Sequence, residues 1–384
     1  MSRGSSIPEV ALVHDYFVQD GGAEAVAIEF TRMFPDAPVH TTYFERERFG
    51  GRIDPGRIRP WRLGQRLPPS PWFRPLLPAY LAHYSRLAVP AGRLVLSNST
   101  TFSRAVRVDP PATHIAYVHS PLRFAWDLDG YLDRSSFPFV ARAGLRAAAP
   151  TLRRWDRWAG RRPDIVVASS INGQERIRRA WGRSTRLIHP PVDVGRLVPT
   201  TDTAGFYLVA TRLLAYKRVD LAVAAAAALD RELIVVGDGP ERARLERLSG
   251  PRTRFLGHLD RSDVDDLLAR CRAFIAPGVE DFGIAPVEAM AVGRPVVAFA
   301  AGGALETVLD GRTGVYFHQA TPGSLAEAIE RLESLELDPA DARTQAATFD
   351  VSIFRDRWWS LLADLGMPDL VPPGPSLAIA PRVT

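Results

Sequence analysis

Cysteine and lysine are almost missing from this chain of 384 residues. Its single cysteine, Cys271, excludes an internal disulfide framework and a metal site built from several cysteines. Its single lysine, Lys217, stands in a chain whose other basic residues are all arginine. A lone ammonium group in such a background is compatible with a site that needs a compact point charge rather than a planar guanidinium.

Long apolar runs are also missing. No stretch reaches the roughly 18 apolar residues that a membrane-spanning helix needs. Residues 1–9 lack the basic flank and apolar core of a signal peptide, so we expect a cytoplasmic protein. With 46% hydrophobic and 24% charged residues, the chain has the composition of a globular protein rather than a disordered one. Its length predicts two or three domains.

Charge is distributed unevenly along the chain. Residues 1–200 contain 29 arginines and 17 acidic residues, whereas residues 201–384 contain 19 basic and 26 acidic residues. A basic first half indicates an anionic partner, such as a nucleic acid, a membrane surface or a phosphorylated acceptor. The alternative is a general bias of the sequence toward arginine.

Short apolar runs alternate with helical patterns in both halves. In the first half we predict strands at 10–13, 39–43, 94–96, 114–118 and 165–168, and helices at 24–33 and 172–181. In the second half we predict strands at 206–210, 233–236, 254–256, 273–276, 295–299 and 314–317, and helices at 219–229, 242–248, 263–271, 285–292 and 325–332. Asn172 and Glu175 are the expected cap of their helix. This alternation predicts an α/β fold with two doubly wound, Rossmann-like domains.

The expected domain boundaries follow from the breaks in this pattern. Residues 192–204 are rich in proline, threonine, aspartate and glycine, which indicates a linker between a domain at 1–195 and one at 200–349. Apolar residues at helical spacing predict a helix at 350–366, which we expect to return to the first domain. The proline-rich residues 367–384 are expected to form a flexible tail.

The segment 59–89 departs from the alternation. It interleaves aromatic and basic residues: Trp61, Trp72, Phe73, Tyr80 and Tyr84 with Arg62, Arg66, Arg74 and Arg86. Such a mixture suits a membrane interface or a lipid-linked acceptor. The alternative is an insertion that packs its own aromatic residues against the domain.

Candidate anion-binding groups follow the first predicted strand of each half. Gly21 and Gly22 precede a predicted helix, where backbone amides can bind a phosphate group. Arg212 and Lys217 follow the first strand of the second half and could neutralise a diphosphate. Each signal is nonspecific alone, because glycine pairs often only form turns and surface cations are common.

Two glutamates spaced eight apart flank another predicted helix start. Glu280 lies in a loop, and Glu288 lies inside the helix that begins near residue 285. A carboxylate can accept two short hydrogen bonds from neighbouring hydroxyls, as in a sugar or a ribose. The sequence therefore predicts a carbohydrate or nucleotide ligand at this loop.

Together these motifs resemble glycosyltransferase family 4. The resemblance rests on Arg212 with Lys217, on Glu280 with Glu288, and on the stretches 235–240 and 255–257. The stretches 117–127 and 302–308 are similar to the branch that contains bacterial O-antigen mannosyltransferases. Membership implies a retaining enzyme with the GT-B fold, in which two Rossmann-like domains face each other across a cleft.

The resemblance also implies roles for particular residues. Arg212 and Lys217 would hold the donor diphosphate with the amides of Gly21 and Gly22. Glu280 would bind a sugar hydroxyl and Glu288 the ribose hydroxyls. The remaining implied donor-site residues are Leu259 beside the base, Phe282, Gly283 and Ile284 around the sugar and phosphate, and His119 near the reacting sugar. We expect His119 to orient or polarise the sugar, and the alternative is a structural histidine at a strand end.

The implied donor is a nucleotide sugar, GDP-mannose first and a UDP-glucose type second, and the implied acceptor is a lipid-linked glycan or polysaccharide. Neither a metal nor a further cofactor is implied, and we interpret the Asp127-Leu128-Asp129 sequence as a chance match to a metal motif. We expect no nucleic acid as a partner, and the composition of segment 59–89 leads us to expect a peripheral contact with anionic membrane at the inner face of the plasma membrane. A dinucleotide-dependent oxidoreductase is disfavoured because the turn at 237–242 lacks the third glycine of that fingerprint. A catalytically silent nucleotide-sugar sensor would keep the same pocket.

Overall fold

The computed structural model describes residues 7–66, 76–128 and 139–371 and contains two parallel sheets. The first sheet has the strand order β3-β2-β1-β4-β5-β6-β7 and the second has the order β10-β9-β8-β11-β12-β13. Every strand pair within these sheets is parallel. Each sheet therefore reverses its winding direction between two central strands, β1 with β4 and β8 with β11, as in a Rossmann-like domain.

The strands are short and their central members are buried. Those of the first sheet are β1 Val10–His14, β2 Val39–Thr41, β3 Ile58–Pro60, β4 Leu94–Ser99, β5 Thr113–Val118, β6 Ile165–Ala168 and β7 Arg186–Leu187. Those of the second sheet are β8 Tyr207–Ala210, β9 Leu233–Val236, β10 Thr253–Gly257, β11 Ala273–Ala276, β12 Val296–Phe299 and β13 Gly314–Phe317. Parallel strands covered on both faces read as continuous apolar runs, which explains why the sequence predicted most of them.

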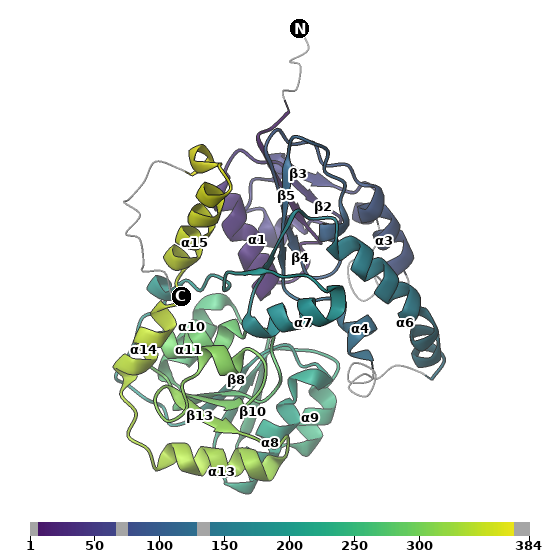
Figure 1. Cartoon of the computed structure of the whole chain (residues 1–384). Helices are drawn as coiled ribbons and strands as arrows, with labels where there is room; N and C mark the ends of the chain where they lie inside the picture. The colour runs from purple at the N-terminus through teal and green to yellow at the C-terminus, as the bar shows by residue number, and fades with distance from the viewer. Residues whose placement is uncertain (1–6, 67–75, 129–138, 372–384) are drawn as a thin grey trace.

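Helices cover both sheets (Figure 1). With the first sheet lie α1 Gly22–Met33, α2 Arg46–Phe49, α3 Leu77–Arg86, α4 Arg123–Trp126, α6 Phe139–Gly160 and α7 Ile171–Trp181. With the second lie α8 Val219–Ala228, α9 Arg242–Leu248, α10 Arg261–Arg270, α11 Ile284–Ala291, α12 Ala304–Thr307, α13 Pro322–Glu333 and α14 Pro339–Ala347. None of the helices within the described ranges is long and apolar enough to cross a bilayer.

The last helix, α15 Val351–Asp364, returns to the first domain as predicted. Its side chains at Phe354, Trp358 and Leu362 are buried in the same core cluster as Phe30 of α1. The ring centroids of Phe30 and Trp358 lie 5.1 Å apart in an edge-to-face arrangement. Figure 1 shows α15 running from the end of α14 in the second domain to a position beside α1.

The two chain crossings between the domains pair with each other. The amide of Val192 donates to Phe349 O over 3.0 Å, and the amide of Val351 donates to Val192 O over 3.0 Å. The predicted linker at 192–204 therefore does not cross alone. The crossings form one two-stranded connection between the domains, and residues 372–384 of the predicted tail lie outside the described residues.

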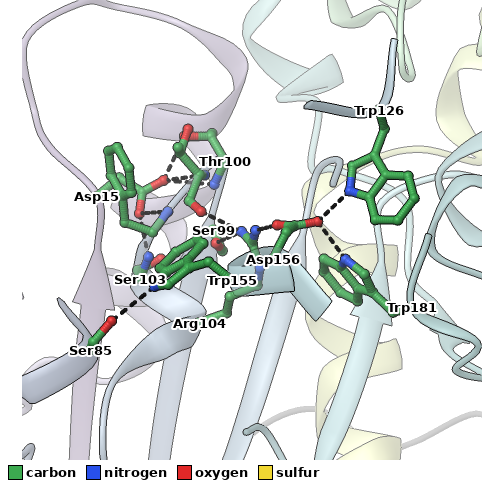
Figure 2. Close-up of polar contacts among 12 residues, drawn as sticks. Asp15, Ser85, Ser99, Thr100, Ser103, Arg104, Trp126, Trp155, Asp156 and Trp181 are labelled. Carbon is green, nitrogen blue, oxygen red and sulfur yellow. Dashed lines mark hydrogen bonds and ion pairs between the residues drawn. The ribbon is translucent and has the colours of Figure 1, made fainter. Parts of the chain in front are cut away.

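A buried polar network supports the loop after β4. Each oxygen of Asp15 accepts hydrogen bonds from that loop, from the backbone amides of Thr100, Thr101, Phe102 and Ser103 at 2.6–2.9 Å and from the Thr100 hydroxyl. Figure 2 shows this carboxylate pointing at the loop. Asp15 is fully buried, so its hydrogen bonds replace those that it would lose to water.

A second buried carboxylate joins three helices (Figure 2). Asp156 of α6 pairs with Arg104, and both side chains are 0% exposed. Its other oxygen accepts from the indole N–H of Trp126 at the end of α4, over 2.7 Å, and of Trp181 at the end of α7, over 2.6 Å. Asp156 therefore fixes α4 and α7 relative to α6.

We predict that Asp156→Asn lowers the free energy of unfolding by about 3–5 kcal/mol, because it leaves the Arg104 guanidinium buried without its counter-charge. Urea denaturation followed by tryptophan fluorescence measures this change. The control is Glu175→Gln, which removes a carboxylate from an exposed arginine cluster on α7 and should change stability little. Equal stabilities of the two variants would contradict the assigned role of the buried pair.

Candidate functional site

The loops that follow the central strands of both sheets meet at the junction between the domains. Arg212, after β8, donates a hydrogen bond of 2.7 Å to Gln19, after β1. Arg123, after β5, pairs with Asp281, after β11. Ligands of open α/β sheets bind beyond the carboxyl ends of such strands. The junction is therefore where a ligand could touch both domains.

Lys217 and Glu280 form an ion pair at this junction. The lysine side chain is 13% exposed and that of the glutamate is 28% exposed. Tyr216 lies between the cations: its hydroxyl is 3.5 Å from Arg212 Nη2, and Lys217 Nζ lies 5.3 Å from its ring centroid. The sequence-predicted residues Arg212, Lys217 and Glu280 thus form one cluster, and Tyr216 was not predicted as part of it.

Glycine permits the close approach that builds this cluster. A Cβ atom at Gly278 would stand 2.7 Å from the backbone oxygen of Lys217. A Cβ atom at Gly303 would stand 2.2 Å from the backbone oxygen of Phe282, and the Gly303 amide donates to Glu280 O over 2.9 Å. Larger residues at either position would displace the loops that carry the lysine and the glutamate.

Glu288 lies in the middle of α11 and is 7% exposed. Its Oε1 atom pairs with Arg261 of α10 and lies 3.6 Å from Arg196 Nη2 in the linker. Burial raises the pKa of Glu288, while Arg261 and Arg196 favour the ionised form. Both arginines approach the same oxygen, and neither was predicted, because their positions along the chain carry no visible link to Glu288.

The remaining predicted residues of this loop differ in exposure. Phe282 is 4% exposed, and its ring centroid lies 5.4 Å from His189 and 5.2 Å from Phe349, beside the paired crossings. Phe282 is therefore packed beneath the loop and supports its conformation. Gly283 has φ 92° and precedes α11, and Ile284 packs against Gly22 of the other domain. Leu259 lies after β10, partly buried against the same core.

Gly21 and Gly22 form the start of α1, as the sequence predicted. Its N-cap residue is Gly21, which has no side chain to accept from the first amides of the helix. The first amides of a helix have no partner within the helix and are free to bind an anion. Gly22 also lies against the second domain, because a Cβ atom there would stand 2.9 Å from Ile284 Cδ1.

His119 follows β5 and is held by Asn98. The Asn98 amide nitrogen donates to Ala23 O over 2.7 Å, so its Oδ1 faces His119 Nε2 at 2.7 Å. His119 Nε2 must then carry the hydrogen, which leaves Nδ1 as an acceptor. Burial, together with the neighbouring His14, lowers the pKa of His119 to about 4, although Asp281 and Asp15 act in the opposite direction. His119 is therefore a neutral imidazole at physiological pH.

Asp281, between the predicted Glu280 and Phe282, connects the domains. It accepts from Arg123 of α4 and, over 2.9 Å, from Arg176 of α7. Burial opposes its ionisation, but Arg123 and Arg176 outweigh burial and hold the pKa of Asp281 below its usual value. Asp281 was not predicted as a site residue, because its partners lie more than a hundred positions away in the sequence.

A second carboxylate of the second domain caps α7. Glu306 accepts from the amides of Ile171 over 2.7 Å and Asn172 over 2.9 Å, and it lies 3.2 Å from His189 Nε2. The predicted cap of this helix by Asn172 and Glu175 is therefore wrong. The N-cap residue of α7 is Ser170. Glu175 instead pairs with two arginines on its own helix.

The described part of segment 59–89 packs its aromatic residues inward. Tyr84 is fully buried, Tyr80 is 6% exposed, and the Trp61 ring stacks on His83 at 4.5 Å. These three aromatic residues therefore pack against their own domain, as the second of the two interpretations of this segment predicted. Arg62, Arg66 and Arg86 are exposed, and a surface cavity of about 480 Å³ is lined in part by Trp61, His83 and Arg86. Trp72, Phe73 and Arg74 lie outside the described residues.

Within the described ranges, no three His, Cys, Asp or Glu side chains gather as a metal site. Asp127 directly follows α4, and Asp129 lies outside the described residues.

Comparison with known proteins gives a family match for the second domain. Residues 199–349 match the family model of the Glycosyl transferases group 1. This range contains the sequence-predicted residues Arg212, Lys217, Glu280 and Glu288.

Curated relatives match at moderate identity. The glycogen synthase of Mycobacterium tuberculosis is 30% identical over 228 residues, which are 54% of this chain and 54% of the relative. A GDP-mannose-dependent alpha-(1-6)-phosphatidylinositol monomannoside mannosyltransferase of Mycolicibacterium smegmatis is 31% identical over 223 residues, 46% of this chain and 58% of the relative. The chain thus spans little more than half the length of these relatives.

Solved structures match over nearly the whole chain. Anabaena HepE in complex with UDP-glucose has a TM-score of 0.68 at 20% identity, covering 92% of this chain and 99% of its own. Sucrose-phosphate synthase from Thermosynechococcus elongatus has a TM-score of 0.67 at 20% identity, covering 94% and 99%. These likenesses confirm the predicted GT-B fold of two Rossmann-like domains.

Proposed function

We propose that the protein is a retaining glycosyltransferase that binds a nucleotide sugar at the domain junction. The observation that carries the proposal is the cluster of Arg212, Lys217 and Glu280 opposite the free amides of Gly21 and Gly22. The match of residues 199–349 to the Glycosyl transferases group 1 supports it.

The cluster suits the departure of a nucleoside diphosphate. Breaking the bond between a sugar and a diphosphate leaves negative charge on the leaving group. Cations and helix amides that are already in place stabilise this charge, and one such group is typically worth about 10²–10³ in rate. In the free protein Lys217 is neutralised by Glu280. On binding, the diphosphate would replace the carboxylate, which would free Glu280 to accept from a sugar hydroxyl.

Transfer with retention would need no enzymic nucleophile in this scheme. The acceptor hydroxyl would attack on the face that the diphosphate leaves, and a phosphate oxygen would take its proton. Neutral His119, with Nδ1 as an acceptor, is suited to receive a hydrogen bond from a sugar hydroxyl. Closure of the domains through Asp281 and Glu306 would exclude water and limit hydrolysis of the donor.

We infer that the donor is GDP-mannose and the acceptor a lipid-linked glycan or polysaccharide, with the reaction on the cytoplasmic face of the plasma membrane. The names of GDP-mannose-dependent relatives favour this donor. The UDP-glucose complex of HepE, a structure of the same fold, keeps a UDP-glucose donor as the alternative. In neither case does the scheme require a cofactor or a metal, because Lys217 and Arg212 supply the positive charge.

We predict that Lys217→Ala and Glu288→Ala each weaken nucleotide-sugar binding tenfold or more, because they remove the cation that would bind the diphosphate and the carboxylate that would accept from the ribose hydroxyls (about 1.5–3 kcal/mol for a charged hydrogen bond). Calorimetric titration with GDP-mannose and with UDP-glucose measures the affinities. Release of the nucleoside diphosphate only when a glycan acceptor is added would distinguish transfer from mere binding.

The controls for these variants are Arg247→Ala and Glu327→Ala, which remove exposed charges from α9 and α13. They should keep wild-type affinity. Unchanged affinity in both site variants would contradict the donor site, and binding without transfer to any glycan would favour a silent sensor.

We also propose that exposed arginines of the first domain contact anionic membrane. Besides those at 62, 66 and 86, helix α6 exposes arginines at 146, 154 and 157, together with Trp158, which is 41% exposed. Each arginine near an anionic surface contributes about 1 kcal/mol. We predict flotation with vesicles containing anionic lipid at low salt, lost at high salt because of screening. No flotation at low salt would contradict membrane contact.

A further inference from the structure

Glu24 is a buried acidic residue with no role in the scheme so far. It is the third residue of α1 and is 2% exposed. Its Oε2 atom has no hydrogen-bond partner among the described residues. Buried polar atoms are nearly always hydrogen-bonded, so this oxygen indicates a missing partner.

The free oxygen faces the candidate phosphate loop. A Cβ atom at Gly21 would stand 2.8 Å from Glu24 Oε2 and 3.8 Å from the side-chain nitrogen of Gln19. Gln19 is the residue that binds Arg212 of the second domain. Glu24 therefore lies beside the first backbone amides of α1 and close to Gln19, which binds Arg212, one of the two cations proposed to bind the diphosphate.

A purely structural role would be that of a capping box. In that motif a glutamate at the third helical position accepts from the N-cap amide and is ionised. No hydrogen bond from the Gly21 amide to Glu24 occurs among the described residues, and Oε2 is left without a donor. The capping role therefore does not account for the position of this carboxyl.

The surroundings of Glu24 favour its neutral form. Burial, with smaller contributions from Asp20 and Asp15, raises the pKa of Glu24 to about 8, although its own backbone N–H and Arg212 favour ionisation. Tyr16 also faces the carboxyl and is itself neutral, because burial raises its pKa above the usual value. A neutral carboxyl is an O–H donor as well as an acceptor.

We propose that Glu24, in its protonated form, donates a hydrogen bond to a phosphate oxygen of the bound nucleotide sugar. The proposal rests on the proposed function and adds a binding residue to that site. An ionised carboxylate at the same place would repel the diphosphate. Bound donor therefore keeps the proton on Glu24, and the proton is not transferred in the reaction.

Because donor binding is linked to the protonation of Glu24, the proposal predicts how donor affinity depends on pH. Below the free-state pKa of about 8, Glu24 already carries its proton, and affinity does not depend on its titration. Above it, binding must take up a proton, so the dissociation constant rises toward about tenfold per pH unit. Donor affinity should thus fall as pH rises through 8.

The test compares wild type with Glu24→Gln, a neutral side chain of the same size that keeps a hydrogen-bond donor. Affinity for GDP-mannose, or for UDP-glucose if that is the sugar bound, is measured by calorimetry between pH 6.5 and 9. Repeating the titration at pH 8.5 in two buffers of different ionisation enthalpy counts the protons taken up. We expect Glu24→Gln to lose the decline in donor affinity above pH 8 and to take up fewer protons on binding than wild type does.

Glu24→Leu, which cannot donate, should bind about tenfold more weakly at pH 7, since a hydrogen bond to a charged group is lost. Glu29→Gln is the matched control, a glutamate on the same helix that is also 2% exposed but is paired with Arg355. It should keep the wild-type pH profile. The same profile and proton uptake in wild type and Glu24→Gln would overturn this inference alone, whereas failure of every nucleotide sugar to bind wild type would overturn the proposed function with it.

Discussion

The arrangement depends on two carboxylates of the second domain that bind donors of the first. Asp281 accepts from Arg123 and Arg176, and Glu306 accepts from the first amides of α7. The ion pairs of Asp281 are partly buried, so the desolvation of each charge must be offset by close partners. These contacts therefore fix which loops meet. Because Glu280 directly precedes Asp281 in the chain, the same contacts place it at the junction beside Lys217.

The charged groups of the candidate site already have ion-pair or hydrogen-bond partners in this structure. Lys217 is paired with Glu280, Glu288 with two arginines, and Arg212 with Gln19. The proposed nucleotide sugar would exchange these partners for its own phosphates and hydroxyls, so its affinity would be the difference between two sets of hydrogen bonds. Glu24 differs from this pattern, because its oxygen has no partner to give up.

Much of the fold could be predicted from the sequence, because buried parallel strands are continuous apolar runs and turns between them are rich in glycine. Helix α15 was predictable because Phe354 and Trp358 keep the spacing of one buried face. Helix α6 was not predicted from the sequence, because its many arginines and Pro150 do not give the pattern of a helix that packs against a sheet.

The site was predictable only in part for a physical reason. Residues such as Lys217 and Glu280 belong to short motifs that carry their chemistry locally. Their supporting contacts are long-range: Glu306 caps a helix 135 positions away, and no local rule links the two segments. The wrong cap at Asn172 has this origin, as do the unrecognised arginines that pair with Glu288.

The central claim is that one ligand is bound by both domains at once. Hydrogen–deuterium exchange with and without the bound nucleotide sugar tests it most directly, because the first amides of α1 have no helical partner and should exchange fast in the free protein. The account predicts that the ligand slows exchange in the loop after β1 and also in the loops after β8 and β11. Slowing confined to a single domain, or located away from these loops, would contradict it.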